Sequence, residues 1–262
     1  MIELNKNEYK RVARLIEADI EKCLYIHMNL INYEKENSSI ITYVDNEILP
    51  KIIIVEYHNS FQLYERETVS NEITDDILEL IKLRTPKMIS GTLSFIKRIH
   101  KLLGNYEYRS GGIFYENQYR DIPDNGIVCE AEAKDAIEIA ELISSNRGIG
   151  GHYDLQDLAN QLKQRIISKT GRSYVIRENG CIVAHTATYA QTNKYAVISG
   201  TIIGLEFRKK NYYMILSNYI IRKLSEEGIR PYTFVINEKM YKYHQKVHEL
   251  SGTYARLTIK GV

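Results

Sequence analysis

The sequence predicts an α+β fold of two domains, and three observations carry that prediction. Helix-period and strand-period segments alternate along the 262-residue chain. The polar segment 119–126, with Pro123, Asp124 and Asn125, interrupts this pattern. After it, the order restarts as strand, two helices, three strands, helix, strand, helix, strand. We therefore expect a smaller N-terminal α/β domain over 1–118, a linker over 119–126, and a second domain over 127–262 with a mixed, mostly antiparallel sheet flanked by helices.

The first half alternates helices and strands. Apolar residues at three- and four-residue spacing predict one long helix from Asn7 to Ile31. His58 and Asn59 predict a tight hairpin turn, and Thr74 is the expected N-cap of a helix. The expected strands are 39–44, 52–57, 60–64, 87–90 and 106–115, and the later helices are 75–83 and 92–103. No phosphate-binding loop is recognisable in this half.

The second half contains the clearest hairpin signal in the chain. Glu178-Asn179-Gly180 joins two strand patterns, which indicates a tight turn. The expected strands are 127–132, 173–178, 181–189, 195–207, 231–236 and 253–259. The expected helices are 134–143, 155–167, 212–228 and 237–246.

Composition argues against several classes of protein. The net charge is +2, from 35 basic and 33 acidic residues, so a nucleic-acid partner is not expected. Cys23, Cys129 and Cys181 lie far apart, which argues against a disulfide framework and a structural zinc site. The N-terminus has no secretory pattern and no apolar run is long enough to span a bilayer, so a cytoplasmic setting without a membrane partner is expected.

A strand, a basic turn and a helix follow one another over 195–228. Arg208, Lys209 and Lys210 form the turn, and the helix begins directly after Asn211. The first turn of a helix presents unpaired backbone N–H groups and a partial positive charge, so this arrangement suits a pyrophosphate. The alternative is an ordinary strand-to-helix crossover whose three cations are solvated.

The second half resembles the GNAT superfamily of acyl-CoA N-acyltransferases. The resemblance rests on the element order and on three local features. These are the strand pair RENGCIVAHTATYA and YAVISGTIIGLEFR, the basic turn, and Asn237 opening a helix that carries Tyr243 and His244. If the first half is a degenerate copy of the same fold, the chain is a tandem GNAT. An unrelated small α+β domain is the alternative.

The resemblance implies acetyl-CoA or another acyl-CoA as co-substrate, with its pantetheine arm beside the central strand. The family's phosphate loop has the pattern [Q/R]-x-x-G-x-[G/A]. Arg208 is similar to its first position, Asn211 stands where the first small residue belongs, and Tyr213 departs from the pattern at the second. The implied acyl-CoA-binding residues are Ile202, Ile203, Gly204, Leu205, Phe207, Arg208, Lys209, Lys210, Asn211, Tyr212, Tyr213 and Asn237.

The resemblance also implies a tyrosine acid that protonates the departing thiolate. Counting from Asn237 points to Tyr243, with His244 second. His185 is the candidate base, and its alternative interpretation is a hydrogen-bonded histidine of the sheet.

The acceptor is expected to be an amine of a small molecule or amino-acid-like compound, near the connector 147–153. The predicted function is therefore N-acyl transfer by direct attack. A catalytically inactive GNAT-fold protein that binds a ligand or partner is the alternative, and Tyr212 and Tyr213 are open to interpretation as a homodimer interface.

Overall fold

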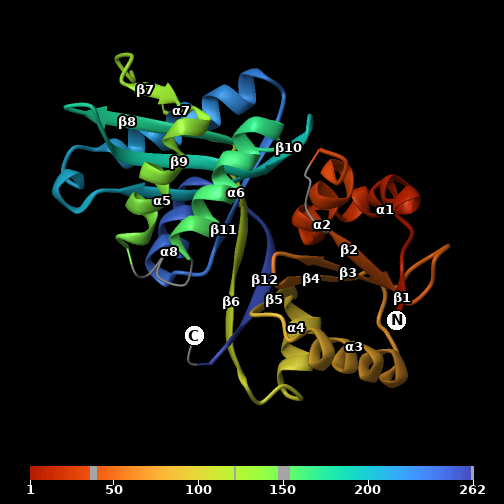
Figure 1. The fold of residues 1–262 in the computed structure, drawn as a ribbon. Helices are drawn as coiled ribbons and strands as arrows, with labels where there is room; N and C mark the ends of the chain where they lie inside the picture. The colour runs from red at the N-terminus through yellow and green to blue at the C-terminus, as the bar shows by residue number, and fades with distance from the viewer. Residues whose placement is uncertain (36–39, 121, 147–153, 261–262) are drawn as a thin grey trace. The chain divides into compact units, whose positions relative to one another are not determined.

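The structure is a computed structural model that describes residues 1–35, 40–120, 122–146 and 154–260 (Figure 1). The chain divides into two compact units. Unit 1 comprises residues 1–113, 235–245 and 250–262, and unit 2 comprises residues 114–234 and 246–249. Residues 250–262, which the linear division assigned to the second domain, thus belong to the first unit. A linker over 119–126 stays a prediction.

One element order occurs twice along the chain. The first run is β1 (Ile2–Glu3), α1 (Tyr9–Ile16), α2 (Ile20–Asn32), β2 (Ile41–Val44), β3 (Ile52–Tyr57), β4 (Ser60–Glu65), α3 (Asn71–Arg84), β5 (Met88–Thr92), α4 (Leu93–His100) and β6 (Tyr106–Tyr115). The second run is β7 (Val128–Glu130), α5 (Ala136–Ser144), α6 (Leu155–Ser168), β8 (Arg172–Glu178), β9 (Cys181–Gln191), β10 (Tyr195–Ile203), α7 (Tyr212–Glu226), β11 (Arg230–Val235), α8 (Glu238–Val247) and β12 (Glu249–Ile259). Each run reads strand, two helices, three strands, helix, strand, helix, strand. The fold therefore repeats in the first half the order that the sequence predicted for the second.

The strands of unit 1 are ordered β1-β2-β3-β4-β5-β12-β6. β5 runs parallel to β4, whereas β12 pairs with β5 in the antiparallel direction. Helices α3 and α4 bury residues such as Ile77 and Phe95 against one face of the sheet. Helices α1 and α2 bury Val12 and Leu30 against the other face (Figure 1). Unit 1 is thus a sheet between two helical layers.

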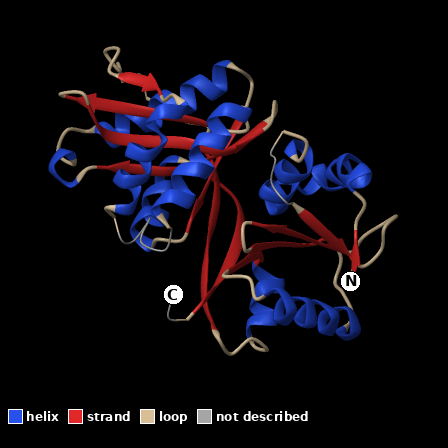
Figure 2. Cartoon of the chain, in the orientation of Figure 1, coloured by secondary structure: helices blue, strands red, loops and turns tan. Residues whose placement is uncertain are grey.

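The strands of unit 2 are ordered β11-β10-β9-β8-β7. β11 runs parallel to β10, and the other neighbouring strands are antiparallel. Helix α7 packs Leu216 and Ile220 against one face, with Tyr174 and Ala196 of the strands in the same cluster. Helices α5 and α6 cover the other face (Figure 2). Unit 2 therefore matches the expected mixed, mostly antiparallel sheet flanked by helices.

The single long helix expected over 7–31 is wrong. A 3-10 turn at Glu17–Asp19 separates α1 from α2. The Cys23 thiol lies 3.4 Å from the carbonyl oxygen of Ile16 and 3.3 Å from that of Asp19, so it donates to carbonyls released at the break. The Asp19 carboxylate accepts a hydrogen bond from Tyr64 at 2.5 Å. Two local contacts of Cys23 and one long-range contact of Asp19 thus accompany a break that periodicity alone does not predict.

Thr74 is not the N-cap of α3, because the helix begins one turn earlier. Ser70 is the N-cap, and its hydroxyl accepts from the N–H of Ile73 at 3.3 Å. Thr74 lies inside the helix and donates to the carbonyl of Ser70. Serine and threonine are both good caps, so the sequence pattern did not distinguish the two positions.

Both predicted tight hairpins are confirmed. Asn179 and Gly180 have φ values of +50° and +85°, and His58 and Asn59 have φ values of +43° and +59°. Positive φ at both central residues is typical of the two-residue turns that match strand twist.

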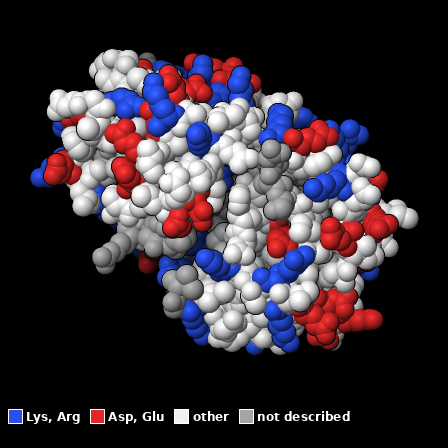
Figure 3. All heavy atoms as spheres, in the orientation of Figure 1, with Lys and Arg blue, Asp and Glu red and all other residues white. Residues whose placement is uncertain are grey.

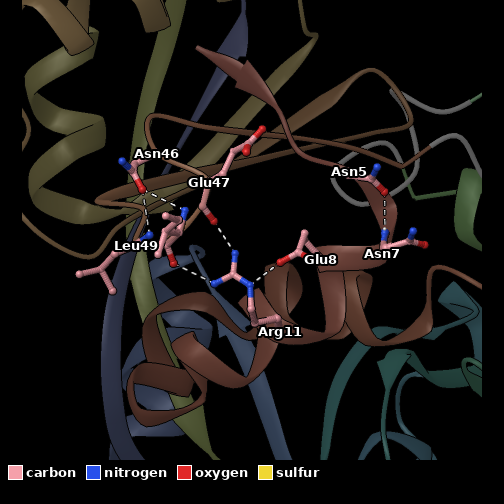
Figure 4. A network of polar contacts seen from close by, with 8 residues as sticks. Asn5, Asn7, Glu8, Arg11, Asn46, Glu47 and Leu49 are labelled. Carbon is pink, nitrogen blue, oxygen red and sulfur yellow. Dashed lines mark hydrogen bonds and ion pairs between the residues drawn. The ribbon is translucent and has the colours of Figure 1, made fainter.

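The loop between β2 and β3 is held by side chains (Figure 4). Arg11 donates to the carbonyls of Glu47 and Ile48, and the Asn46 side chain accepts from the N–H groups of Ile48 and Leu49. Ile48 and Leu49 are nonetheless 80% and 53% exposed. The hydrogen bonds thus hold this apolar pair at the surface in one backbone conformation.

Charge is mixed on the face that Figure 3 shows. Figure 3 shows basic and acidic side chains interspersed on the visible face, in keeping with a net charge of +2. Among the described helices, none is long and apolar enough to cross a membrane.

Candidate functional site

The parallel strands β10 and β11 of unit 2 pair at one end and then separate. Their paired residues run from Tyr195 opposite Arg230 to Ile198 opposite Thr233. β10 continues to Ile203, and no pair with β11 follows Ile198 within the described part of these strands. A strand beyond its last pair still presents N–H and C=O groups on that side. We call this side of residues 199–203 the open edge of β10.

A one-residue bulge lies in β10 beside the open edge. Ser199 lies opposite Ala187 of β9 and Ile202 lies opposite His185, so three steps along β10 match two along β9. Gly200, inside this interval, has a φ of +66°. One extra residue in one strand defines a β-bulge, and a left-handed glycine is common there.

The bulge sets which backbone groups face the open edge. The N–H of Gly204 donates to the carbonyl of Val183 on β9 at 2.8 Å. Backbone groups of successive residues in an antiparallel strand point to opposite sides. Ile203, the preceding residue, therefore directs its N–H and C=O away from β9 and toward the open edge.

The side chains around the bulge are closely packed. A Cβ at Gly200 would lie 2.5 Å from the hydroxyl oxygen of Tyr189. The hydroxyl oxygens of Thr186 and Thr201 are 2.7 Å apart and hydrogen-bonded. Position 200 thus requires glycine for two reasons, its positive φ and the lack of space.

His185 is a buried member of this cluster. Its side chain is fully buried, with Nδ1 2.9 Å from the Gly200 carbonyl and Nε2 3.2 Å from the Ser173 hydroxyl. Because a carbonyl only accepts, Nδ1 carries the proton and Nε2 of the neutral ring accepts from Ser173. Burial lowers the pKa of His185 from 6.5 to about 4, and the hydrogen bond to Gly200 opposes that shift. This geometry favours the hydrogen-bonded sheet histidine over a base that contacts substrate.

The basic turn follows the open edge directly. The strand expected to reach Phe207 ends at Ile203, because Leu205–Phe207 form a 3-10 turn. Arg208, Lys209 and Lys210 are exposed, and Asn211 adopts φ +59° before α7. The Asn211 side chain makes no capping hydrogen bond, and the first turn of α7 contains no acidic residue. The helix N-terminus therefore keeps its affinity for an anion.

Glu178 interacts with this turn from the β8–β9 hairpin. Its carboxylate accepts from Lys210 at 2.6 and 2.7 Å, and from the Tyr212 hydroxyl. The hydrogen bond from Lys210, and then that from Tyr212, lowers the pKa of Glu178. The same carboxylate raises the pKa of Lys210 and of Tyr212. One of the three cations of the turn is thus already paired.

In unit 1, the end of β4 and the start of α3 correspond to the open edge and the basic turn, and they are capped and acidic. The N-terminus of α3 is capped by Ser70 and has Glu72 in its first turn. Glu65, at the end of β4, accepts from the N–H of Val69 at 3.2 Å. β4 extends only two residues beyond its last pair with β5, Leu63 opposite Gly91. Within its described residues, unit 1 therefore lacks both the long open edge and the basic helix start of unit 2.

The structure brings together one part of the predicted site. Residues 202–213 form a continuous segment from the open edge to the start of α7, and Tyr213 is half-buried in its first turn. His185 lies behind this segment, hydrogen-bonded to the bulge.

The remaining predicted residues belong to the other unit. Asn237, Tyr243 and His244 belong to unit 1, where the Asn237 side chain caps α8 by accepting from Met240 at 3.1 Å. His244 is buried and contacts the Tyr243 ring edge-on. Their roles stay predictions, and the acceptor connector 147–153 lies outside the described residues.

Sequence reasoning missed Gly200 and Glu178 as members of the site, and Ser173 as the hydrogen-bond partner of His185. A glycine inside a strand pattern is a signal for a bulge, and Gly200 in YAVISGTII carries it. The contacts of Ser173 and Glu178 depend on register and left no comparable signal.

Comparison with known proteins identifies the fold. No protein-family model and no curated protein sequence match this chain. Among solved structures, a GCN5-related N-acetyltransferase-like protein from Streptococcus suis is 15% identical with a TM-score of 0.62, covering 97% of this chain and 99% of that one. A tandem GNAT protein from the clavulanic acid biosynthesis pathway is 12% identical with a TM-score of 0.61, covering 98% and 97%. A Drosophila protein is 11% identical with a TM-score of 0.69, covering 98% and 97%.

At these identities the likeness concerns the fold alone. The structural neighbours include GNAT acetyltransferases and a tandem GNAT protein matched over nearly the whole chain. The resemblance drawn from the sequence is therefore confirmed for the fold, including its tandem form.

Proposed function

We propose that this protein binds an acyl-CoA along the open edge of β10 and at the N-terminus of α7, both in unit 2, and transfers the acyl group to an amine. One observation carries the proposal. The two repeats have the same element order. Within the described residues, only the second repeat combines an open edge with an uncapped basic helix start. A protein that kept the fold for purely structural reasons would not need this difference.

The described residues fit an acyl-CoA. Its pantetheine amides would hydrogen-bond to the N–H and C=O of Ile203, which are directed away from β9. A strand edge accepts an added strand in the same way. Its phosphates suit the start of α7, where Arg208 and Lys209 are exposed. Lys210 would divide its hydrogen bonds between Glu178 and the phosphates.

Acyl transfer from an acyl-CoA requires few catalytic groups from the protein. An acyl-CoA supplies an activated thioester, so the chain must position it, accept the proton of the attacking ammonium and stabilise charge on the carbonyl oxygen. We propose Tyr243, with His244 second, as the acid for the thiolate. The proposed acceptor is a small-molecule or amino-acid-like amine.

Replacing Arg208 by Glu tests where the phosphates bind. Titration calorimetry of the wild type with acetyl-CoA, and with non-reactive desulfo-CoA, is expected to give one site per chain with micromolar affinity. The R208E variant should bind at least about tenfold more weakly, because a carboxylate would face the phosphates. Lys163→Glu makes the same change of charge on α6, on the opposite face of the sheet, and should bind like the wild type. Unchanged affinity in R208E would show that the phosphates bind elsewhere.

Replacing Glu178 by Gln is expected to strengthen binding. The change removes a negative charge beside the proposed phosphates and frees Lys210 from its ion pair. We expect affinity for desulfo-CoA to rise by about threefold at low salt and the gain to shrink as salt is added. Glu141→Gln on α5 is the matched control. Weaker binding in E178Q would mean that Glu178 orders the turn more than it repels the ligand.

A GNAT-fold protein that binds a ligand or partner without catalysis is the second candidate. It is favoured by Tyr213, a large residue half-buried in the first turn of α7, where the family pattern has a small one. Binding of acetyl-CoA without release of free CoA across a panel of amines would support this candidate. Release of CoA with any amine would exclude it.

A further inference from the structure

We infer that His185 is a positioning residue for the acyl-CoA site, because it holds the β10 bulge in the register that turns Ile203 toward the open edge. The inference rests on the proposed function and names the buried side chain on which the geometry of that edge depends. His185 itself, fully buried, would not touch the ligand.

Without the bulge, β10 would pair with β9 in a different register. If pairing continued from Ser199 and Ala187 with no extra residue, Thr201 would lie opposite His185 and Ile203 opposite Val183. Ile203 would then bond to β9, and its N–H and C=O would be lost to the open edge. In the observed register Gly204 makes that bond instead, at 2.8 Å. Because of the extra residue, Gly204 bonds to β9 and the N–H and C=O of Ile203 face the open edge.

A bulge is stabilised when the backbone groups that leave the strand ladder find other partners. The imidazole of His185 donates to the Gly200 carbonyl at 2.9 Å, within the bulge itself. Ser173 lies 3.2 Å from the other ring nitrogen and orients the ring. These contacts link β8, β9 and β10 side by side, so the register of β10 is fixed from within the sheet.

The chemistry of the side chain at position 185 can be separated from its size. Leucine would leave the partly buried Gly200 carbonyl without this donor. Asparagine has an amide nitrogen close to the place of Nδ1 and can still donate to the same carbonyl. Ser173→Ala removes only the second hydrogen bond. The three variants distinguish loss of the Gly200 contact from general damage to the core.

Calorimetry with desulfo-CoA is the first test. We expect His185→Leu to bind at least about tenfold more weakly than the wild type, whereas His185→Asn and Ser173→Ala stay within about threefold. Ile139→Val, a mild change in the same buried layer, controls for lowered stability and should bind normally. A His185→Leu protein that folds and binds like the wild type would overturn the inference. So would equal loss of binding in the leucine and asparagine variants.

A second measurement does not depend on acyl-CoA. In wild-type protein labelled uniformly with ¹⁵N and ¹³C, NMR should detect coupling across the hydrogen bond from Nδ1 of His185 to the Gly200 carbonyl. The N–H of Gly204 should exchange slowly and that of Ile203 faster. Absence of the coupling would overturn the positioning role even if His185→Leu fails to fold. Presence of the coupling in a protein that binds no acyl-CoA would instead refute the proposed function, and with it the link to acyl-CoA, while the hold of His185 on the bulge would stand.

Discussion

Replacing Gly200 by Ala is expected to lower the free energy of unfolding by about 2–4 kcal/mol. The φ of +66° costs a residue with a Cβ about 1–2 kcal/mol. The new Cβ would also lie 2.5 Å from the Tyr189 hydroxyl oxygen, so the cluster around the bulge must shift. Urea unfolding followed by circular dichroism measures the change.

Gly180→Ala is the matched control for this prediction. Gly180 has a φ of +85°, and a Cβ there would have no neighbour within 4 Å. Its cost should therefore be only the backbone strain, about 1–2 kcal/mol. If the two variants lose equal stability, the contact with Tyr189 contributes nothing and the bulge is less tightly packed than the distances indicate.

Acidification is expected to destabilise the protein through His185 by up to about 3 kcal/mol. Burial lowers the pKa of His185 to about 4 in the folded state, against 6.5 ordinarily. Between these values the unfolded chain binds a proton that the folded chain does not. The stability contributed by the neutral histidine is therefore complete above pH 6.5 and is lost as the pH falls toward 4.

Carboxylates titrate over part of the same range, so the measurement is a difference between proteins. The unfolding free energies of wild type and His185→Asn are compared at several values of pH from 7 to 4. The advantage of the wild type should shrink steadily with acidification, because asparagine does not titrate. A constant difference for His185→Asn would contradict the buried, neutral state.

Local patterns predicted much of the fold. The hairpin turn at Asn179 and Gly180 was predictable because only residues that tolerate positive φ fit two-residue turns. The basic turn from Arg208 to Lys210 was predictable because a strand pattern changes to a helix pattern across it. The break between α1 and α2 was not, since the Asp19–Tyr64 contact that accompanies it spans 45 positions.

In the candidate site, too, local patterns predicted some residues and long-range contacts placed the others. Residues 202–213 were predictable, because they are consecutive and need only the element order to be placed. Glu178 was not, since its partner Lys210 lies 32 positions away. Tyr243 and His244 were placed by counting from Asn237, and in the structure all three belong to unit 1.

Local patterns thus predicted the order of elements in the second half, the two hairpin turns and the basic start of α7, because periodicity and turn chemistry act within a few residues. Only the tertiary structure decided the register of β10 against β9, the open edge beyond Ile198 and the grouping of residues 250–262 with unit 1. Strand pairing brings together residues far apart in the chain. One extra residue in a strand reverses the edge toward which the backbone N–H and C=O of each following residue point. The chemistry proposed for this protein depends on that register.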